Sequence, residues 1–229
     1  MIHGTLIKRY KRFLADVWIN EGKEQVLAHV PNTGSMKGLC DEGMPVLLSY
    51  DGNPKRKIPH TLEAVCVQGT WVGCNTRVPN QLVEEAVLKG QIEGLTGYKT
   101  VKREVNYGEN SRIDLFLSDH VDGKPNAYVE VKNVTLREGD EAQFPDAVTV
   151  RGKKHLEELQ NQVKKGFRSV MVFLIQRDDC ARFAPARGID PAYADELQKA
   201  HKNGVEIICK VARVSPEETA IIHDLPWVL

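Results

Sequence analysis

The hydrophobic pattern of this chain changes its period near residue 76, and that change limits the folds open to it. Before this point, apolar residues alternate with polar ones in short runs, separated by turn-forming segments such as residues 20–22 and 51–54. Alternation with a period of two is typical of half-buried strands. From residue 80 the apolar residues follow a helical period, and strands and helices then succeed one another. The sequence therefore predicts an all-β domain over residues 1–76 and an α/β domain over residues 77–229.

The first region contains several short strand-like runs. We expect strands at residues 3–8, 12–19, 25–29, 45–50, 60–67 and 70–74. Short strands joined by regular turns are typical of a small barrel or sandwich. A region of this length suits a small barrel of the OB (oligonucleotide/oligosaccharide-binding) type, and an SH3-like barrel stays open as the alternative.

The second region mixes strands and helices. A helix is expected to begin at residues 78–80 and to end near Gly90, where glycine is a frequent helix terminator. Residues 170–175 are apolar throughout, which suits a central strand that is covered on both faces. Together these runs predict one mixed sheet with flanking helices. We expect the remaining strands at 99–105, 111–117, 126–132, 205–213 and 219–223, and the remaining helices at 150–165 and 191–203.

Two neighbouring strands carry the polar residues of greatest interest. Glu130 and Lys132 are separated by one residue, so in a strand both side chains leave the same face. If Asp114 lies on the adjoining strand, two carboxylates and an ammonium converge. Such a set can hold a hard divalent cation, Mg²⁺ or Mn²⁺, and position water for attack on a phosphate, as in PD-(D/E)xK nucleases. On spacing alone an ordinary solvated strand face is the better interpretation, but the helices on either side favour the metal site.

The upstream helix offers Glu85, which falls beside Leu82 at the border of the apolar stripe and could reach a metal over the sheet edge. The downstream helix begins after Thr149, a suitable N-cap, with several cations in its first turns. Cations oppose the helix dipole there, so a bound phosphate would offset the cost. His155 is open between a phosphate contact and a packed polar residue. We predict metal binding by Asp114 and Glu130, catalytic roles for these two with Lys132 and Glu85, and phosphate contacts from Arg151, Lys153 and Lys154.

The β region carries basic runs interleaved with aromatic residues, a pattern that fits binding to single strands or to a nucleic-acid backbone. A solvated face with the aromatic residues in the core is an equally good interpretation. The loop 29–39 combines small hydroxyl residues, glycines and a lysine and could cradle a phosphate, although it lacks the Walker spacing. The predicted nucleic-acid contacts of this region are Lys8, Arg9, Lys11, Arg12, Lys37, Lys55, Arg56 and Lys57.

Composition narrows the class of protein. The 31 basic and 31 acidic residues cancel, which still allows nucleic-acid binding through a local patch. No apolar run reaches the length of a membrane helix, and the N-terminus lacks the apolar core of a signal peptide. The 5 cysteines form no CxxC pair, which indicates reduced thiols and no structural zinc. We expect a soluble cytoplasmic protein with DNA, or RNA, as its partner and no membrane partner. The oligomeric state stays open, with a homodimer as one alternative.

Several longer segments resemble the sugar fermentation stimulation protein A family over essentially the whole chain. The segments are His29-Val30-Pro31-Asn32-Thr33-Gly34-Ser35-Met36, Val72-Gly73-Cys74-Asn75-Thr76, Ser111-Arg112-Ile113-Asp114, Val129-Glu130-Val131-Lys132-Asn133-Val134-Thr135-Leu136 and residues 144–156. The resemblance implies an N-terminal OB-like domain, a PD-(D/E)xK nuclease-like domain, DNA binding and a link to the regulation of sugar (maltose) metabolism. By position it assigns Asp114, Glu130 and Lys132 to the nuclease core and Glu85 to the helix carboxylate. One departure is Val150, where the family pattern commonly has an acidic residue.

Two hypotheses follow. The first is a DNA-binding protein whose second domain is a metal-dependent nuclease, and the intact set of carboxylates and lysine favours it. The second is a DNA-binding regulator that keeps the nuclease fold without cleaving. The lack of a helix-turn-helix signature weakens a sequence-specific regulator.

Overall fold

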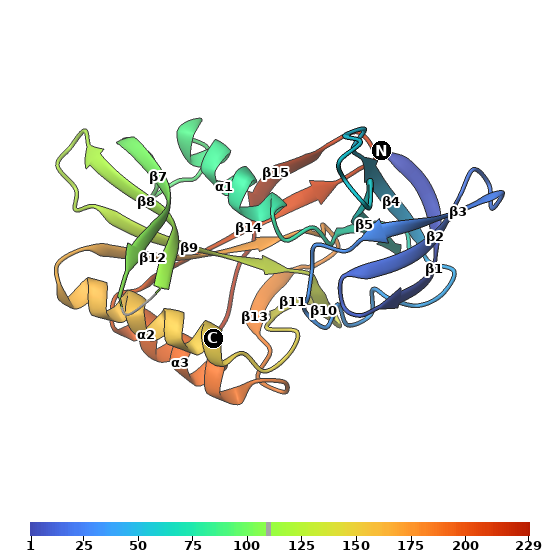
Figure 1. The fold of residues 1–229 in the computed structure, drawn as a ribbon. Helices are drawn as coiled ribbons and strands as arrows, with labels where there is room; N and C mark the ends of the chain where they lie inside the picture. The colour runs from blue at the N-terminus through green and yellow to red at the C-terminus, as the bar shows by residue number, and fades with distance from the viewer. Residues whose placement is uncertain (109–110) are drawn as a thin grey trace.

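The computed structural model describes residues 1–108 and 111–229. Figure 1 shows a barrel of N-terminal strands lying beside a larger unit in which helices cover both faces of a sheet. Among the described helices, none is both long and apolar enough to cross a membrane. The barrel packs against one side of the larger unit, and residues of both units line the cleft between them.

The barrel consists of one sheet with the strand order β3-β2-β1-β4-β5-β6. A short parallel pairing of Ala28 with His60 joins β3 to β5 and closes the barrel. Alternate residues such as Leu6, Val17 and Leu62 fill its interior and are almost fully buried. The strands are β1 (Ile2–Tyr10), β2 (Leu14–Ile19), β3 (Glu24–His29), β4 (Pro45–Tyr50), β5 (His60–Val67) and β6 (Thr70–Gly73).

The second unit is built on a mixed sheet with the order β15-β14-β12-β9-β8-β7. Its central strands β9, β12 and β14 are parallel, and the outer strands are antiparallel. Helix α1 covers one face, and α2 and α3 cover the other (Figure 1). The mixed sheet with flanking helices is confirmed. The strands are β7 (Tyr98–Tyr107), β8 (Ser111–His120), β9 (Ala127–Val134), β12 (Arg168–Ile175), β14 (Glu206–Val214) and β15 (Thr219–Asp224), and the helices are α1 (Val78–Leu88), α2 (Val150–Lys164) and α3 (Pro191–Lys202).

A small third sheet was not expected from the sequence. It has the order β10-β11-β13, with β10 (Leu136–Glu138), β11 (Glu141–Phe144) and β13 (Arg182–Pro185). None of the strands expected from the sequence covers β10, β11 or β13. These strands hold three or four residues each, and β11 pairs in parallel with β13 far along the chain. Strands this short, paired with residues distant in sequence, produce no hydrophobic periodicity that sequence reading could detect.

Close contacts hold the barrel against the larger unit. The Gly73 amide donates to the Gln176 carbonyl over 2.9 Å, and the Gln176 side-chain amide donates to the Gly73 carbonyl over 3.2 Å. A Cβ atom on Gly73 would meet Gln176 Oε1 at 2.4 Å, so only glycine allows this approach. On the opposite side of the cleft, Asp146 binds the barrel loop through Ser35 and Met36. These contacts fix the barrel loop as one wall of the cleft between the units.

Candidate active site

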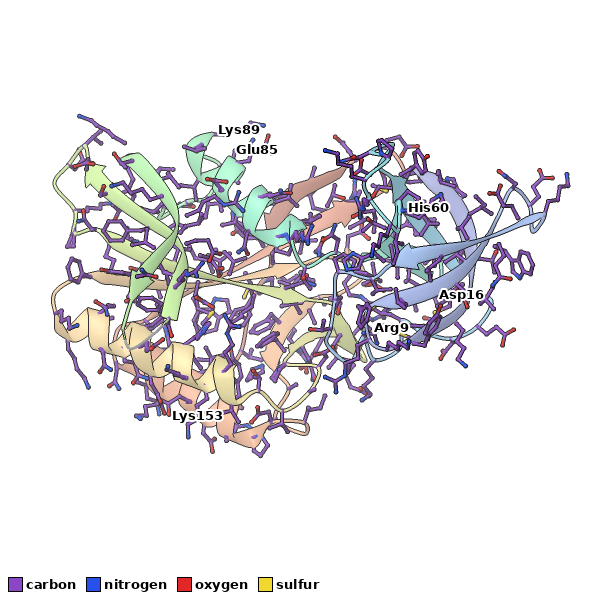
Figure 2. The ribbon with its side chains drawn as sticks, viewed as in Figure 1. Arg9, Asp16, His60, Glu85, Lys89 and Lys153 are labelled. Carbon is purple, nitrogen blue, oxygen red and sulfur yellow. The ribbon has the colours of Figure 1, made fainter. Side chains whose placement is uncertain are left out.

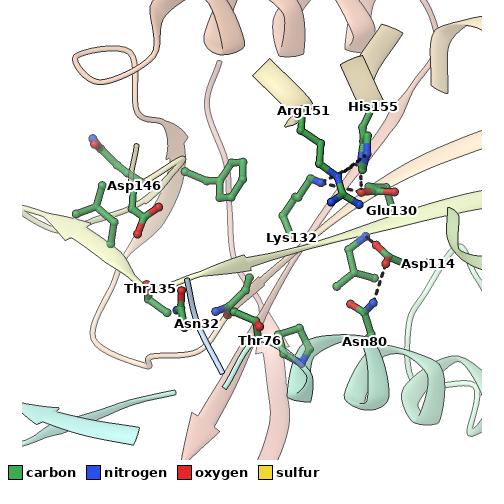
Figure 3. A pocket seen from close by; sticks show the side chains of 16 residues that line it. Asn32, Thr76, Asn80, Asp114, Glu130, Lys132, Thr135, Asp146, Arg151 and His155 are labelled. Carbon is green, nitrogen blue, oxygen red and sulfur yellow. Dashed lines mark hydrogen bonds and ion pairs between the residues drawn. The ribbon is translucent and has the colours of Figure 1, made fainter. Parts of the chain in front are cut away.

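A cleft of about 340 Å³ lies at the junction of the barrel and the α/β unit (Figure 3). Every layer of the molecule contributes to its lining. The barrel side supplies Asn32 and Thr76, and α1 supplies Asn80. The strands β8 and β9 supply Asp114, Glu130 and Lys132, and the start of α2 supplies Arg151 and His155. The sequence prediction that Asp114, Glu130 and Lys132 lie together is therefore met.

Asp114 stands where the ladder between β8 and β9 stops. The paired residues end at Leu115 opposite Val129, one step before Asp114 would face Glu130. Instead, Asp114 Oδ2 accepts a hydrogen bond from the Val131 amide over 2.7 Å, and Oδ1 accepts from Asn80 Nδ2 over 2.7 Å. These two donors fix the Asp114 carboxylate beside the strand that carries Glu130.

Glu130 forms the floor of the cleft and is only 3% exposed. Its Oε1 accepts from Lys132 Nζ over 2.7 Å and makes a short contact with His155 Nδ1. Its Oε2 is buried and has no hydrogen-bond partner among the described residues. Buried polar atoms are nearly always paired, because an unpaired one carries a desolvation cost of roughly 1–3 kcal/mol. The free oxygen of Glu130 therefore needs a ligand such as a cation or a water.

His155 is a packed residue that orients Glu130. Arg151 Nε donates to His155 Nε2 over 3.3 Å. A guanidinium only donates, so Nε2 acts as the acceptor, and the ring hydrogen is then assigned to Nδ1, facing Glu130. This contact resolves the open assignment of His155 in favour of packing, because both ring nitrogens are occupied by protein groups.

The two carboxyl groups titrate in opposite directions. Burial, together with the negative charge of Glu130, raises the pKa of Asp114 to about 6. Burial also acts to raise the pKa of Glu130, but Lys132 and His155 outweigh it and hold that pKa below its ordinary value. Near pH 7 both groups are ionised, and among the described residues Lys132 is the ammonium that contacts the pair, through Glu130. The site thus has excess negative charge that a divalent cation would neutralise.

The donor set fits a hard cation of the magnesium type. Carboxylate oxygens are preferred ligands of Mg²⁺ and Mn²⁺. Within residues 1–108 and 111–229, no group of three or more His, Cys, Asp and Glu side chains is arranged to enclose a metal. A cation held by Asp114 and Glu130 would therefore complete its coordination with water or substrate oxygens, as Mg²⁺ commonly does.

The first turns of α2 divide between the site and the outer surface. Arg151 lines the main cleft, and Arg151 and Lys154 both line an adjoining cavity of about 480 Å³ that shares Asp114 and Glu130 with it. Lys153 lines neither cavity, and Figure 2 shows it below α2 in the view. The structure thus groups Arg151 and Lys154 with the carboxylates and leaves Lys153 apart. The predicted N-cap is confirmed, since Thr149 accepts from the Gly152 amide.

Glu85 does not belong to the site, and the prediction that it does is wrong. Its side chain is 57% exposed and pairs with Lys89 over 2.5 Å. Figure 2 shows the two labelled residues next to each other at α1. It borders surface hollows with Leu82 and Thr219, none of which contains Asp114 or Glu130. The residue by which α1 reaches the carboxylates is Asn80, which sequence reasoning missed.

The predicted nucleic-acid contacts of the barrel fall into two groups. Arg9 donates to the carbonyls of Arg12, Asn32, Gly34 and Ser35, so its donors hold the loop together. Arg56 is similarly engaged with Asp51 and Thr61. The other side chains are exposed: Lys8, Lys11, Arg12, Lys37, Lys55 and Lys57.

The loop expected to cradle a phosphate is already occupied. Ser35 Oγ donates to Asp146 Oδ2 over 2.8 Å, and the Met36 amide donates to the same oxygen over 3.0 Å. A protein carboxylate thus takes the position that a phosphate would need. The loop serves as an inter-domain contact, and the idea of a phosphate cradle at Ser35 and Met36 is wrong for this structure.

Comparison with known proteins identifies both halves of the chain. The family described as the SfsA N-terminal OB domain matches residues 7–74, which confirms the OB barrel over the SH3-like alternative. The family described as the sugar fermentation stimulation protein RE domain, a restriction-endonuclease-like domain, matches residues 77–218.

Full-length relatives are also found. A sugar fermentation stimulation protein homolog of Paramagnetospirillum magneticum is 54% identical, with 95% of this chain and 91% of the relative covered. A homolog of Geobacter sulfurreducens is 50% identical, with coverage of 97% and 94%. The solved structure of Pyrococcus furiosus SfsA in complex with Ca²⁺ superposes with a TM-score of 0.90 at 26% identity, covering 100% of this chain and 96% of that one. The chain therefore belongs to the SfsA family of sugar fermentation stimulation proteins.

Proposed function

We propose that this protein is a divalent-metal-dependent nuclease that hydrolyses phosphodiester bonds of nucleic acid in the junction cleft. The observation that carries the proposal is the state of Glu130. One of its oxygens is buried without a partner among the described residues, while Asp114 and Lys132 stand beside it. A purely structural buried carboxylate would have both oxygens satisfied.

Asp114 and Glu130 would hold Mg²⁺ or Mn²⁺. Such a cation, when bound, supplies positive charge against the phosphate and makes a nearby water more acidic. The related Pyrococcus furiosus protein, solved in complex with Ca²⁺, supports a hard-cation site in this family. The Asn80 and Val131 donors would keep Asp114 oriented, and the His155 contact would do the same for Glu130.

Lys132 is the proposed catalytic cation. Its ammonium is anchored on Glu130 Oε1 and lies 3.3 Å from His155 Nδ1, and its side chain is 14% exposed, so it lies at the cleft floor within reach of a substrate. There it would orient the attacking water and stabilise negative charge on the phosphate oxygens. Arg151, which lines both cavities, would bind an adjacent phosphate. The exposed barrel cations would add affinity for the nucleic-acid backbone without regard to sequence.

A second candidate is a DNA-binding regulator of sugar metabolism that keeps the nuclease fold without cleaving. The specific observation in its favour is that no three acidic or histidine side chains enclose a metal among the described residues. The exposed barrel cations would serve such a protein equally well.

The deciding experiment is cleavage of labelled single- and double-stranded DNA and RNA by the full chain with Mg²⁺ or Mn²⁺, with and without EDTA. Lys132→Ala should slow cleavage by on the order of 10²–10³, since that is the usual effect of removing one group that stabilises transition-state charge. Affinity for the same substrates should stay within a few-fold. Lys89→Ala, on the outer side of α1, is the matched control and should cleave as wild type does. If wild type cleaves none of the four substrates, the regulator is favoured.

A further inference from the structure

The two cavities that meet at the carboxylates have different linings. The cavity on the β8 and α2 side is lined by charged side chains, with the cations Arg112, Arg151 and Lys154 beside Glu104, Asp114 and Glu130. Apart from Asp146, whose carboxylate is bonded to Ser35 and Met36, the barrel side of the main cleft is lined by uncharged amide and hydroxyl groups and one aromatic ring: Asn32, Asn133, Thr135, Gln143 and Phe144. Phosphates favour the first lining, whereas hydrogen bonds and ring contacts to a base favour the second.

Part of the hydrogen-bonding capacity on the barrel side is unused. Asn133 accepts from Gln176 through Oδ1, and no described residue accepts from its amide nitrogen. Gln143 donates to Glu141, and no described residue donates to its Oε1. The Thr135 hydroxyl also has no hydrogen bond to a described residue, although Thr135 is only 7% exposed. Together they offer a donor, an acceptor and a hydroxyl, the groups that read the edge of a nucleobase.

The dimensions of the cleft restrict what can enter. A volume of about 340 Å³ is at the small-ligand end of binding pockets, which usually span roughly 300–1,000 Å³. The barrel wall is fixed by Arg9 on one side of loop 32–36 and Asp146 on the other. Glu130 lies at the bottom and is 3% exposed. A cleft of this size accommodates a single nucleotide at the carboxylates.

We propose that the barrel side of the cleft is a nucleobase subsite, and that the substrate is single-stranded nucleic acid or an unpaired strand end. This inference rests on the proposed nuclease function, because it assumes that a phosphodiester lies at the carboxylates. One base contacts Asn133, Thr135 and Gln143, and the adjoining phosphates run toward Arg151 and Lys154. Asn32 of the barrel then forms one wall of the subsite. The barrel thereby contributes to substrate selection as well as to general affinity for nucleic acid.

The test is calorimetric titration of the full chain with Ca²⁺ present and with 2′-deoxynucleoside 5′-monophosphates as probes. Deoxyribose 5-phosphate, which lacks only the base, is the reference ligand. One bound base typically contributes a roughly 5- to 150-fold gain in affinity. At least one mononucleotide should therefore bind more than fivefold more tightly than the reference. Gln143→Ala and Thr135→Val should lower that ratio several-fold, while Gln91→Ala, an exposed glutamine beyond α1, should leave it unchanged.

Equal affinities for mononucleotide and reference, or no mononucleotide binding at millimolar concentration, would overturn the subsite. This measurement needs no cleavage, so its result is separable from that of the cleavage assay. If duplex and single strands are cleaved equally well and no base preference is found, the nuclease stands and the subsite falls. If mononucleotides bind with a base preference and no substrate is cleaved, the subsite stands and the nuclease proposal falls.

Discussion

The carboxylate of Asp114 accepts the hydrogen bond of the Val131 amide over 2.7 Å and so takes the place of a backbone carbonyl at the end of the β8–β9 ladder. This contact couples the geometry of the sheet to the geometry of the site. Val131 lies between Glu130 and Lys132, so the same contact fixes Asp114 relative to both of its functional neighbours. Removing the charge of Asp114 while keeping an acceptor for Val131 should separate its electrostatic role from its structural one.

Asp114→Asn should stabilise the metal-free protein near pH 7. The folded state raises the pKa of Asp114 from 3.8 to about 6, so the fold favours the protonated form, and stability is lost as pH rises through this interval. A shift of this size corresponds to at most about 3 kcal/mol. Asparagine can still accept from Val131, and its amide can donate to Asn80 Oδ1 once the Asn80 side chain turns its amide over. Urea unfolding with EDTA should show a gain at pH 7.5 that disappears below about pH 4.

Asp122→Asn, in the exposed turn after β8, is the control for that experiment and should change stability little at either pH. A loss of stability in Asp114→Asn at pH 7.5 would mean that its hydrogen bonds outweigh its charge repulsion.

Metal affinity should fall in acid through the same group. A cation requires the ionised carboxylate, and protons compete for it below a pKa of about 6. From this competition alone, Mn²⁺ should bind about tenfold more weakly at pH 5 than at pH 7.5. Glu130, whose pKa is held below its ordinary value, should stay ionised over this range. Titration calorimetry at both pH values measures the ratio, and Asp114→Asn should remove most of the affinity together with its pH dependence. An affinity that does not change with pH would contradict the assignment of Asp114 as a ligand.

The sequence predicts much of this fold because its signals are local. The alternation of β1–β5 and the apolar run of β12 each determine an element within a few residues. Glu130 and Lys132 could be paired because one intervening residue decides their common face. The strands β10, β11 and β13 could not be found, since their pairing depends on contacts distant in sequence.

The prediction that α1 contributes Glu85 to the site failed for a geometric reason. At about 100° per residue, Glu85 and Asn80 fall on opposite sides of the apolar stripe of α1. The stripe shows which face meets the sheet but not which border faces the carboxylates. The orientation of α1 across the sheet decides this, and it places Asn80 at Asp114 and turns Glu85 toward Lys89. The role of His155 depends likewise on a contact with Glu130 that spans 25 residues of sequence.

Asp146→Ala should loosen the barrel wall of the cleft. It removes the acceptor for both Ser35 Oγ and the partly buried Met36 amide. Losing a partner for such groups typically costs roughly 1–3 kcal/mol. Hydrogen exchange should therefore accelerate in residues 32–37 more than in the strands of the barrel. Asp41→Ala, an exposed carboxylate close to the same loop, is the matched control. Unchanged exchange in the loop would show that Arg9 alone is sufficient to hold it.

Arg9 and its lysine neighbours should respond differently to substitution, although they share one basic run. The Arg9 guanidinium donates to backbone carbonyls of the loop, so Arg9→Ala should lower the unfolding temperature. Lys8 and Lys11 are exposed, so replacing both by Ala should leave stability unchanged and weaken nucleic-acid binding. Each lost phosphate contact should reduce the steepness of the log–log salt dependence by roughly 0.7 for single strands or 0.9 for duplex. Fluorescence anisotropy over a salt series measures this, with Lys23→Ala in the β2–β3 turn as control. If the double variant keeps the wild-type salt dependence, Lys8 and Lys11 do not contact the nucleic acid.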